Sequence, residues 1–306
     1  MRLATFSHAG RVSAGVVDSS QMRPFAGGLS VRDAVGLGVA AASALDLLPG
    51  VPRKEVQLLA PLQPASIRDF VAFEEHVAGV RRSIDGRGGV PDAWYDAPAF
   101  YFTNPHTLLG PDADVPFPAA AVARDFELEV AAVVGPDATI FGYTIFNDWS
   151  ARDLQSREMR VNLGPVKGKD FAGSLGPWLV TADELSGFAD ADGFLELECT
   201  ASVNGVEVGR DLLSHMGWTF ETLLAYAARD SRVVAGDVLG SGTVGNGGCL
   251  AELWGRNGTQ EPPPLRDGDV VTLTVQGIGS LSNRVVSAPP AAPIPAFRRS
   301  LGKVNP

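Results

Sequence analysis

The sequence predicts a mostly β fold of the α+β class, a mixed sandwich or roll with a small N-terminal lobe. Short apolar or alternating segments recur along the chain, and 35 glycines and 22 prolines punctuate them. Alternation with a period of two places successive side chains on opposite faces of a strand. Many short strands separated by turns, with few predicted helices, favour a sandwich, roll or barrel over a doubly wound sheet.

The first part of the chain is predicted to form the small lobe. Strand-like pieces at residues 3–6, 12–17 and 56–59 surround one helical stretch at 30–42, for which Ser30 is the expected N-cap. Two prolines and a serine at 61–66 then interrupt the pattern. We therefore expect a lobe at residues 1–60 and a larger domain at residues 61–306, which opens with a helical run at about 67–82.

The larger domain is predicted to consist mainly of strands. They are expected at residues 100–102, 126–134, 141–146, 178–181, 195–203 and 270–275. Asn204-Gly205 predicts a hairpin, because a type I′ turn needs positive φ at both central residues, and Asp267-Gly268 predicts a second, weaker one. Helices are expected at 150–159 and at 219–229, the latter capped by Thr219.

Charge and composition narrow the range of partners and the compartment. The formal net charge of -10, without a large Lys/Arg cluster, argues against binding to nucleic acid or to an anionic membrane. The two cysteines, Cys199 and Cys249, match neither a zinc site nor a disulfide framework. The N-terminus has no apolar stretch of signal-peptide length, and no run long enough to span a bilayer occurs. We expect a cytoplasmic protein.

Three acidic clusters are candidates for chemistry. Glu127 and Glu129 are two apart in a predicted strand and point to one face, where a hard cation would relieve their repulsion, although a solvated strand face is the simpler alternative. Asp148 ends an apolar strand. Asp69 and His76 are seven apart, close to one side of the helix expected there, and His is the side chain best suited to proton transfer near neutral pH.

Polar side chains that could hold an anionic substrate follow Asp148. Arg152 and Gln155 are three apart, on one face of the predicted helix, and both offer hydrogen-bond donors. An Asp or Ser at the start of such a helix is usually only an N-cap. A cap alone does not account for the Arg152 and Gln155 pair.

The stretch Asn147-Asp148-Trp149-Ser150-Ala151-Arg152-Asp153-Leu154-Gln155 resembles the signature of the fumarylacetoacetate hydrolase family. Further matching positions are Gly164-Pro165, Gly168-Lys169, Pro177-Trp178, Glu127-x-Glu129, Gly240-Ser241-Gly242-Thr243 and Glu252-Leu253. The resemblance covers roughly residues 60 to 285, and the N-terminal lobe is similar only in position. It implies the family's fumarylacetoacetase-like fold and a homodimer.

The resemblance also implies roles for individual residues. Asp69, Glu127, Glu129 and Asp148 would bind a divalent cation, usually Mg2+ and sometimes Ca2+ or Mn2+. His76 would be the base that activates water, oriented by Glu252. A third set would hold the substrate or stabilise the departing carbanion: Arg152, Gln155, Lys169, Tyr101 and Thr243.

Several positions depart from the family pattern. Met159 stands where the fumarylacetoacetases proper have a substrate-contacting tyrosine, and Gly173 stands in place of their threonine. One residue is inserted between Gln155 and Lys169. The shorter acylpyruvase-like members carry a glutamate three residues after their histidine, where this chain has Gly79. The expected dyad is therefore His76 with Glu252.

The implied activity is divalent-metal-dependent hydrolysis of a carbon-carbon bond in a small diketo acid or 2-oxo acid, through an enolate whose charge the metal stabilises. The same enolate serves isomerases, decarboxylases and hydratases, so an enzyme of that kind, acting on a 2-oxo dicarboxylate from aromatic degradation, is the alternative. A catalytically inactive binding or scaffold protein is a second alternative. The presence of every expected ligand and of the dyad argues against it.

Overall fold

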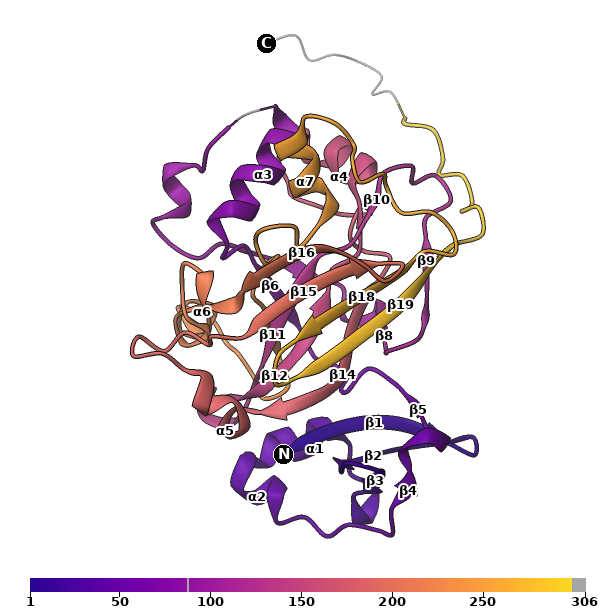
Figure 1. Cartoon of the computed structure of the whole chain (residues 1–306), viewed down its shortest axis with the longest axis vertical. Coiled ribbons are helices and arrows are strands. Elements are labelled where there is room, and N and C mark those ends of the chain that lie inside the picture. The colour runs from indigo at the N-terminus through magenta and orange to yellow at the C-terminus, as the bar shows by residue number, and fades with distance from the viewer. Residues whose placement is uncertain (87, 299–306) are drawn as a thin grey trace.

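The computed structural model describes residues 1–86 and 88–298, and most of its strands form one long sheet (Figure 1). Along its main path, neighbouring strands are β4 (Val51–Pro52), β3 (Gln21–Pro24), β2 (Arg11–Val17), β1 (Arg2–His8), β14 (Gly173–Thr181), β12 (Ile140–Asn147), β11 (Leu128–Val134), β17 (Val238–Gly240), β6 (Ile67–Phe70) and β7 (Phe100–Thr103). β5 (Gln57–Leu58) pairs with β1, and β8 (Leu108–Leu109) pairs with β14.

A second sheet covers one face of the first and makes the larger part a sandwich. Its strands, in order, are β16 (Val206–Leu212), β15 (Glu198–Val203), β18 (Val270–Val275), β19 (Gly279–Ser287) and β9 (Asp114–Phe117). A short ladder joins β10 (Arg124–Asp125) to β13 (Ser150–Ala151). The main hydrophobic core combines Val130 and Ala132 of β11 with Ala201 of β15 and Leu273 of β18. The prediction of a mostly β, α+β fold is confirmed.

The lobe at the N-terminus lies at one end of the molecule (Figure 1). Its helices α1 (Val31–Leu37) and α2 (Val39–Ser43) contribute to a second hydrophobic cluster, together with Val133 of β11 and Leu179 of β14. β1 pairs antiparallel with β14, so hydrogen bonds between strands run across the predicted boundary at residue 60. The division into two domains at that residue stays a prediction.

The remaining helices lie around the sandwich. They are α3 (Glu74–Asp85), α4 (Arg152–Met159), α5 (Ala182–Leu185), α6 (Phe220–Ala228) and α7 (Leu250–Asn257). α3 and α7 pack closely at the end far from the lobe, because both carry a glycine at the contact. A Cβ on Gly255 would lie 2.0 Å from the carbonyl oxygen of Gly79, so only glycine permits this approach.

Several local predictions are confirmed. The Asn204-Gly205 turn has φ of 53° and 78° at its two residues and joins β15 to β16 as a hairpin. Ser30 and Asp33 form a capping box at the start of α1, and the Thr219 hydroxyl accepts a hydrogen bond at the start of α6.

Other local predictions are wrong. Residues 67–70 form strand β6 instead of the start of a helix, because they pair with both β17 and β7, and α3 begins only at Glu74. The helix expected at 30–42 is broken at Gly38, whose φ is 82°. Asp267-Gly268 forms a turn before β18 without joining two neighbouring strands of the described chain. Helix α7 was not expected.

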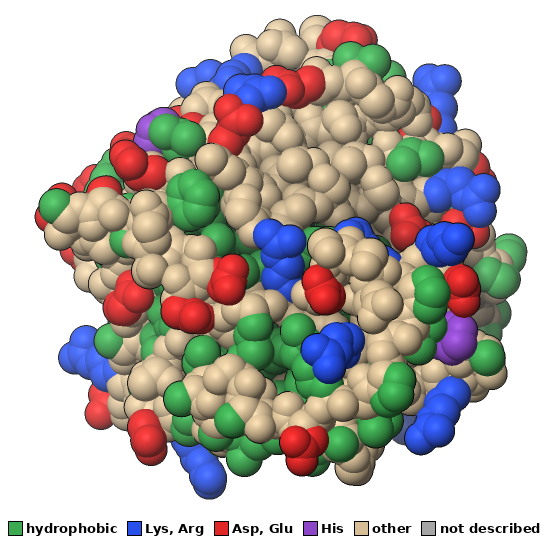
Figure 2. Space-filling view, turned by 60° about the horizontal axis from the view of Figure 1, so that its bottom comes forward, with side chains coloured by type: hydrophobic (Ala, Val, Ile, Leu, Met, Phe, Trp, Pro, Cys, Tyr) green, Lys and Arg blue, Asp and Glu red, His purple; other side chains and the backbone are tan. Residues whose placement is uncertain are grey.

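The surface carries both acidic and basic side chains, as the composition of the sequence leads one to expect. Figure 2 brings the lobe's end of the molecule forward and shows Lys/Arg and Asp/Glu side chains interspersed around hydrophobic ones on that face. Within residues 1–86 and 88–298, no helix is both long enough and apolar enough to cross a bilayer.

Candidate metal centre and active site

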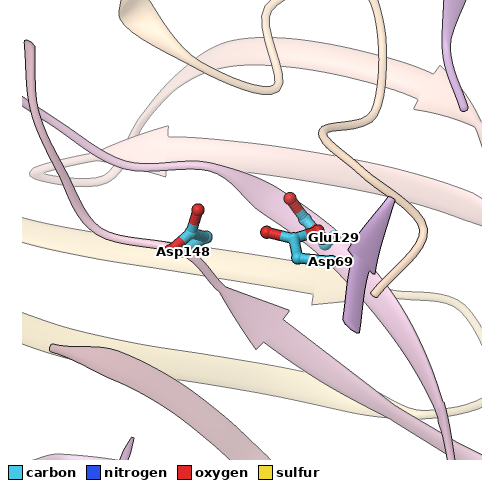
Figure 3. A group of neighbouring side chains, drawn as sticks. All are labelled: Asp69, Glu129 and Asp148. Carbon is cyan, nitrogen blue, oxygen red and sulfur yellow. The ribbon is translucent and has the colours of Figure 1, made fainter. Parts of the chain in front are cut away.

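Three buried carboxylates from separate parts of the sheet meet at one point. Asp69 lies in β6, Glu129 in β11, and Asp148 directly follows β12. One oxygen of each lies within 4.8 Å of the others, and the three residues are at most 2% exposed. In Figure 3 the carboxylates of Asp69 and Glu129 lie next to each other, and that of Asp148 faces them from the neighbouring strand end. Sheet order brings them together, since β12, β11, β17 and β6 are successive neighbours.

Glycines at the end of β17 and just after it make room for these carboxylates. A Cβ on Gly240 would lie 2.7 Å from Asp69 Oδ1 and equally close to Glu129 Oε2, so any side chain there would displace them. The backbone N–H of Gly242 donates to Glu129 Oε2 at 3.1 Å. The Gly240-Ser241-Gly242 motif therefore positions the acidic cluster, a role that its sequence alone does not reveal.

The cluster has the properties of a site for a hard divalent cation. Asp69 Oδ1 and Asp148 Oδ1 are buried and lack a hydrogen-bond partner within the described part of the chain. Burial, and next the charge of a neighbouring carboxylate, raises the pKa of Asp69 and of Glu129 well above the ordinary range. Burial also raises the pKa of Asp148, although Lys169 opposes it. A cation bound by these carboxylates would give the two unpaired oxygens a partner and would offset the repulsion between the carboxylates.

Glu127, the fourth expected ligand, faces cations instead of the other three carboxylates. Its Oε1 lies 2.7 Å from a guanidinium nitrogen of Arg152, and its Oε2 accepts a hydrogen bond from Lys169 Nζ. Burial alone would raise the pKa of Glu127, but Lys169 and Arg152 outweigh it and hold that pKa below its usual range. Lys169 also donates to Asp148, so one ammonium bridges Glu127 and the metal cluster.

Arg152 and Gln155 lie on α4 and contact each other, as their spacing predicted. Arg152 Nη1 donates to Gln155 Oε1 at 3.1 Å, and its Nε donates to Asp125 Oδ2 at 2.8 Å. Asp125 also accepts the backbone N–H groups of Leu250 and Ala251 at the start of α7. The sequence did not indicate a role for this fully buried carboxylate, because Asp125 is only one of several acidic residues near Glu127.

The expected dyad of His76 and Glu252 is not formed by any hydrogen bond or ion pair among the described residues. His76, in the first turn of α3, has Nε2 4.0 Å from Glu127 Oε1 and Nδ1 3.7 Å from the Cys249 sulfur. Glu252 instead pairs with Arg256 and accepts the N–H of Gly247, while its buried Oε2 has no partner in the described chain. The dyad stays a prediction, and Cys249 is a neighbour of His76 that the sequence did not indicate.

Burial changes the pKa of both members of that pair. It lowers the pKa of His76 to about 4, with Arg152 and Lys169 acting in the same direction and Glu127 against it. It raises the pKa of Glu252 to about 7, with Arg256 opposing. His76 is therefore neutral at physiological pH, a form that can accept a proton at one ring nitrogen and donate one from the other.

A cavity of about 180 Å³ opens onto the cluster. Among the residues that line it are Asp69, His76, Glu127, Glu129, Tyr101, Lys169 and Thr243. The Tyr101 hydroxyl donates to Asp148, and burial raises the pKa of that phenol well above its usual range. The cavity thus brings Asp69, Glu127 and Glu129 together with the general acid–base candidate His76 and the proton donors Tyr101 and Lys169.

Comparisons with known proteins find a matching family model and similar relatives. The family model described as "Fumarylacetoacetate (FAA) hydrolase C-terminal" matches residues 65–286 of the chain. The fumarylacetoacetase of Arabidopsis thaliana is 29% identical, over 77% of this chain and 72% of the relative. Oxaloacetate tautomerase YisK of Bacillus subtilis (strain 168) is 27% identical, over 76% of this chain and 73% of the relative.

Solved structures share the fold. A 2-keto-3-deoxy-D-arabinonate dehydratase, complexed with magnesium and 2,5-dioxopentanoate, matches with a TM-score of 0.70 at 21% identity. The match covers 95% of this chain and 100% of that one. At this level of identity, the likeness concerns the fold.

Proposed function

The chain belongs to the fumarylacetoacetate hydrolase family, and from this premise we propose that it is a divalent-cation-dependent enzyme acting on a small 2-oxo acid or diketo acid. The observation that carries the proposal is the cluster of Asp69, Glu129 and Asp148, with its two unpaired buried oxygens beside Lys169. Mg2+ is the first cation to test, since the dehydratase of the same fold was solved with it. Glu127 is a further candidate ligand of the cation.

The cation, when bound, would supply Lewis-acid polarisation of a substrate carbonyl and would offset negative charge that develops on its oxygen. Lys169 and Arg152 keep their positive charge in this buried site, because Glu127 lies between them. They would stabilise the enolate oxygen in the same way that fixed donors stabilise any developing oxyanion. Tyr101, with its raised pKa, holds a proton next to Asp148.

We propose hydrolysis of a carbon-carbon bond as the first reaction to test. The fumarylacetoacetase relative supports this choice. Neutral His76 would remove a proton from water in the cavity, and general base catalysis of this kind typically contributes ~10²- to 10⁴-fold. Glu252 would assist only after turning from Arg256 toward His76.

Keto-enol tautomerisation or isomerisation is the second candidate, and the contacts of His76 favour it. The Nδ1 of His76 faces the thiol of Cys249 instead of a carboxylate, which would make the imidazole more basic. A neutral imidazole can return a proton to an enolate carbon without activating water. The oxaloacetate tautomerase relative supports this candidate.

The test compares oxalate with acetylacetone as inhibitors, with and without Mg2+. A 2-oxo acid would chelate the cation through a carboxylate oxygen and its neighbouring carbonyl, an arrangement that oxalate reproduces with its charge already in place. Acetylacetone mimics the chelate of a 1,3-diketone. We expect Mg2+-dependent competition by oxalate in turnover assays over a panel of 2-oxo acids and diketo acids. Inhibition by acetylacetone alone would contradict the 2-oxo acid assignment.

Other expectations from the sequence remain proposals. They are a homodimer, a cytoplasmic location and a place in the degradation of aromatic compounds. Light scattering of the purified protein tests the first.

A further inference from the structure

Cys249 is a buried neighbour of His76 without a role of its own in the proposed reaction. Its sulfur lies 3.7 Å from His76 Nδ1, and the side chain is fully buried. Cys249 is the N-cap of α7, where its sulfur accepts a hydrogen bond from the backbone N–H of Glu252 at 3.4 Å. The contact therefore joins the start of α7 to the first turn of α3, which carries His76.

The thiol of Cys249 has one hydrogen to donate, and His76 Nδ1 is the acceptor within reach. Burial raises the pKa of this thiol well above its usual range, with the charge of Asp125 acting in the same direction and Arg152 opposing, so the thiol keeps its hydrogen at neutral pH. The sulfur already accepts the N–H of Glu252, so the S–H group points elsewhere. Among the described residues, His76 Nδ1 is the one partner that can accept it.

The other ring nitrogen of His76 has a negatively charged neighbour. Nε2 lies 4.0 Å from Glu127 Oε1. Burial alone would raise the pKa of Glu127, but Lys169 and Arg152 outweigh it and keep this carboxylate ionised. A hydrogen on Nε2 would be attracted by that charge, whereas a lone pair there would be repelled. Both neighbours of the ring therefore favour the same tautomer, with the hydrogen on Nε2 and the lone pair on Nδ1.

A carboxylate at Nδ1 would select the opposite tautomer. It would accept a hydrogen bond from Nδ1–H and leave the lone pair on Nε2, which is the arrangement of a general base. Glu252 is the carboxylate expected at this place from the sequence, but it pairs with Arg256 and accepts the N–H of Gly247. The thiol of Cys249 lies next to Nδ1 instead.

Nε2 is the ring nitrogen on the side of the active-site cavity. His76 and Glu127 line the cavity of about 180 Å³, whereas Cys249 is not among the described residues that line it. With its hydrogen on Nε2, His76 can donate a hydrogen bond to an enolate oxygen in this cavity. It then has no lone pair on Nε2 with which to take a proton from water.

We propose that Cys249 is a positioning residue, whose S–H group holds His76 as the Nε2–H tautomer and so makes it a hydrogen-bond donor to the substrate instead of a base. The inference rests on the proposed function, in which an enolate forms beside the cation. It separates the two candidate reactions, because keto-enol tautomerisation can use such a donor, whereas hydrolysis with His76 as the base requires the other tautomer.

Nitrogen NMR of the full chain, isotope-labelled at its four histidines, identifies the tautomer, because a ring nitrogen that carries a hydrogen and one that carries a lone pair resonate far apart. The signals of His76 are those that disappear in His76→Gln. At neutral pH we expect a hydrogen on Nε2 and a hydrogen-bonded lone pair on Nδ1. A hydrogen on Nδ1, or on both nitrogens, would overturn the proposal. This spectrum decides the tautomer even if a cysteine variant does not fold.

Variants of the two cysteines separate a positioning role from a structural one. In Cys249→Ala the Nδ1 signal should move to that of a lone pair without a partner, and the tautomer ratio should shift toward Nδ1–H roughly 2- to 10-fold, the value of one hydrogen bond. Cys249→Ser keeps a donor and the cap of α7, so it should restore the original signals. Cys199→Ala is the matched control, because that thiol is equally buried but contacts the Leu197 carbonyl. It should leave the His76 signals unchanged.

Turnover with Mg2+ provides an independent measurement. Cys249→Ala should lower kcat several-fold and leave KM nearly unchanged, because the hydrogen bond from Nε2 strengthens as the enolate forms, and Cys249→Ser should recover the rate. Unchanged His76 signals in Cys249→Ala, or a loss of rate that Cys249→Ser does not recover, would overturn the role of the thiol. If the signals behave as expected but no 2-oxo acid or diketo acid is turned over, the tautomer assignment stands and the proposed function falls.

Discussion

The four acidic side chains of the site differ in their pKa shifts because their neighbours differ. Asp69, Glu129 and Asp148 have raised pKa values, chiefly because burial disfavours their charge. The charge of Asp148 also raises the pKa of Asp69, and the charge of Asp69 raises that of Glu129. Glu127 is equally buried, but Lys169 and Arg152 keep its pKa low. The first three are therefore suited to receive a cation, whereas Glu127 already balances two cations of the chain.

This difference predicts separate effects of two substitutions. Asp148→Asn should remove most of the rise in melting temperature expected with Mg2+, because it neutralises a proposed ligand whose Oδ1 lacks a partner in the described chain. Glu127→Gln should keep much of that rise but cost about 3–5 kcal/mol of stability, because Lys169 and Arg152 would remain buried beside a neutral partner. Thermal unfolding with and without Mg2+ measures both.

The exposed Glu196 supplies the control, since Glu196→Gln should leave both quantities unchanged. An equal loss of the Mg2+ response in the Glu127 and Asp148 variants would instead place Glu127 among the direct ligands, as the family resemblance implies.

The raised pKa values also predict how stability depends on pH. In the metal-free protein Asp69, Glu129 and Asp148 keep protons that the unfolded chain, with carboxyl pKa values of about 4, has released. The folded state binds more protons in that window, so its stability should fall as pH rises from about 4 toward the raised values. Glu127 acts oppositely, since its stabilisation is lost only at more acidic pH.

Binding of Mg2+ to these carboxylates, as proposed, would displace those protons, so its stabilising effect should grow with pH over the same window. Calorimetry in buffers of different ionisation enthalpy measures the protons released on binding. Mg2+ affinity that stays constant with pH, without proton release, would contradict the assignment of these carboxylates as ligands.

At the scale of elements, the contact between α3 and α7 decides where His76 and Glu252 lie. A Cβ on Gly79 would lie 2.5 Å from Glu252 Cγ, and one on Gly255 would meet backbone atoms of α3. This packing explains why Gly79 stands where the acylpyruvase-like relatives are expected to carry a glutamate. A side chain at that position would push α7 away from α3 and with it the carboxylate that α7 carries.

Gly255→Ala is therefore expected to destabilise the protein by about 1–3 kcal/mol, the usual cost of overpacking, because rigid backbone lies 2.0 Å from the new Cβ. It should also lower turnover, since α3 carries His76. Gly36→Ala in α1 is the matched control: its Cβ would meet nothing within 4 Å, so it should be neutral or stabilise by about 0.5–1 kcal/mol. Chemical denaturation measures both, and equal effects would refute the close-packing explanation.

At the scale of the whole molecule, the small lobe and the catalytic sandwich share one sheet. β1 pairs with β14, and the second hydrophobic cluster joins Val31 and Val35 of the lobe to Phe146 and Leu179 of the large sheet. The lobe thus covers the face of the sheet that the five-stranded sheet leaves open. Its contribution is to the stability of the scaffold that holds Asp148 and Glu129.

Removing residues 1–60 should consequently prevent cooperative folding. The deletion would expose the apolar face around Phe146 and Leu179 and would leave β14 as an open edge, which favours aggregation. Thermal unfolding and size-exclusion chromatography of residues 61–306 check this. The matched control ends the chain at residue 287, because Ile294 and Phe297 are 90% and 88% exposed and their loss should be tolerated. A truncated protein that melts like the full chain would show that the lobe is dispensable.

Local signals in the sequence were sufficient for the fold class and for several elements. Alternation predicted most strands of the sandwich, Asn204-Gly205 predicted its hairpin, and Ser30 predicted a cap, because each of these depends on interactions within a few residues. The motif around Asp148 and Arg152 indicated the family that the comparison with the family model then showed. Glu127 and Glu129 were recognised as a pair, although their chemical surroundings were not.

Only the tertiary structure decided those surroundings. Asp69 lies on a strand because β17 and β7 pair with it, an effect that outweighs the local helical pattern. Glu127 meets Lys169 across 42 residues, and His76 meets Cys249 across 173. Such contacts depend on strand register and on how closely two helices approach. These are properties of packing between distant segments, so a pattern within one segment does not determine them.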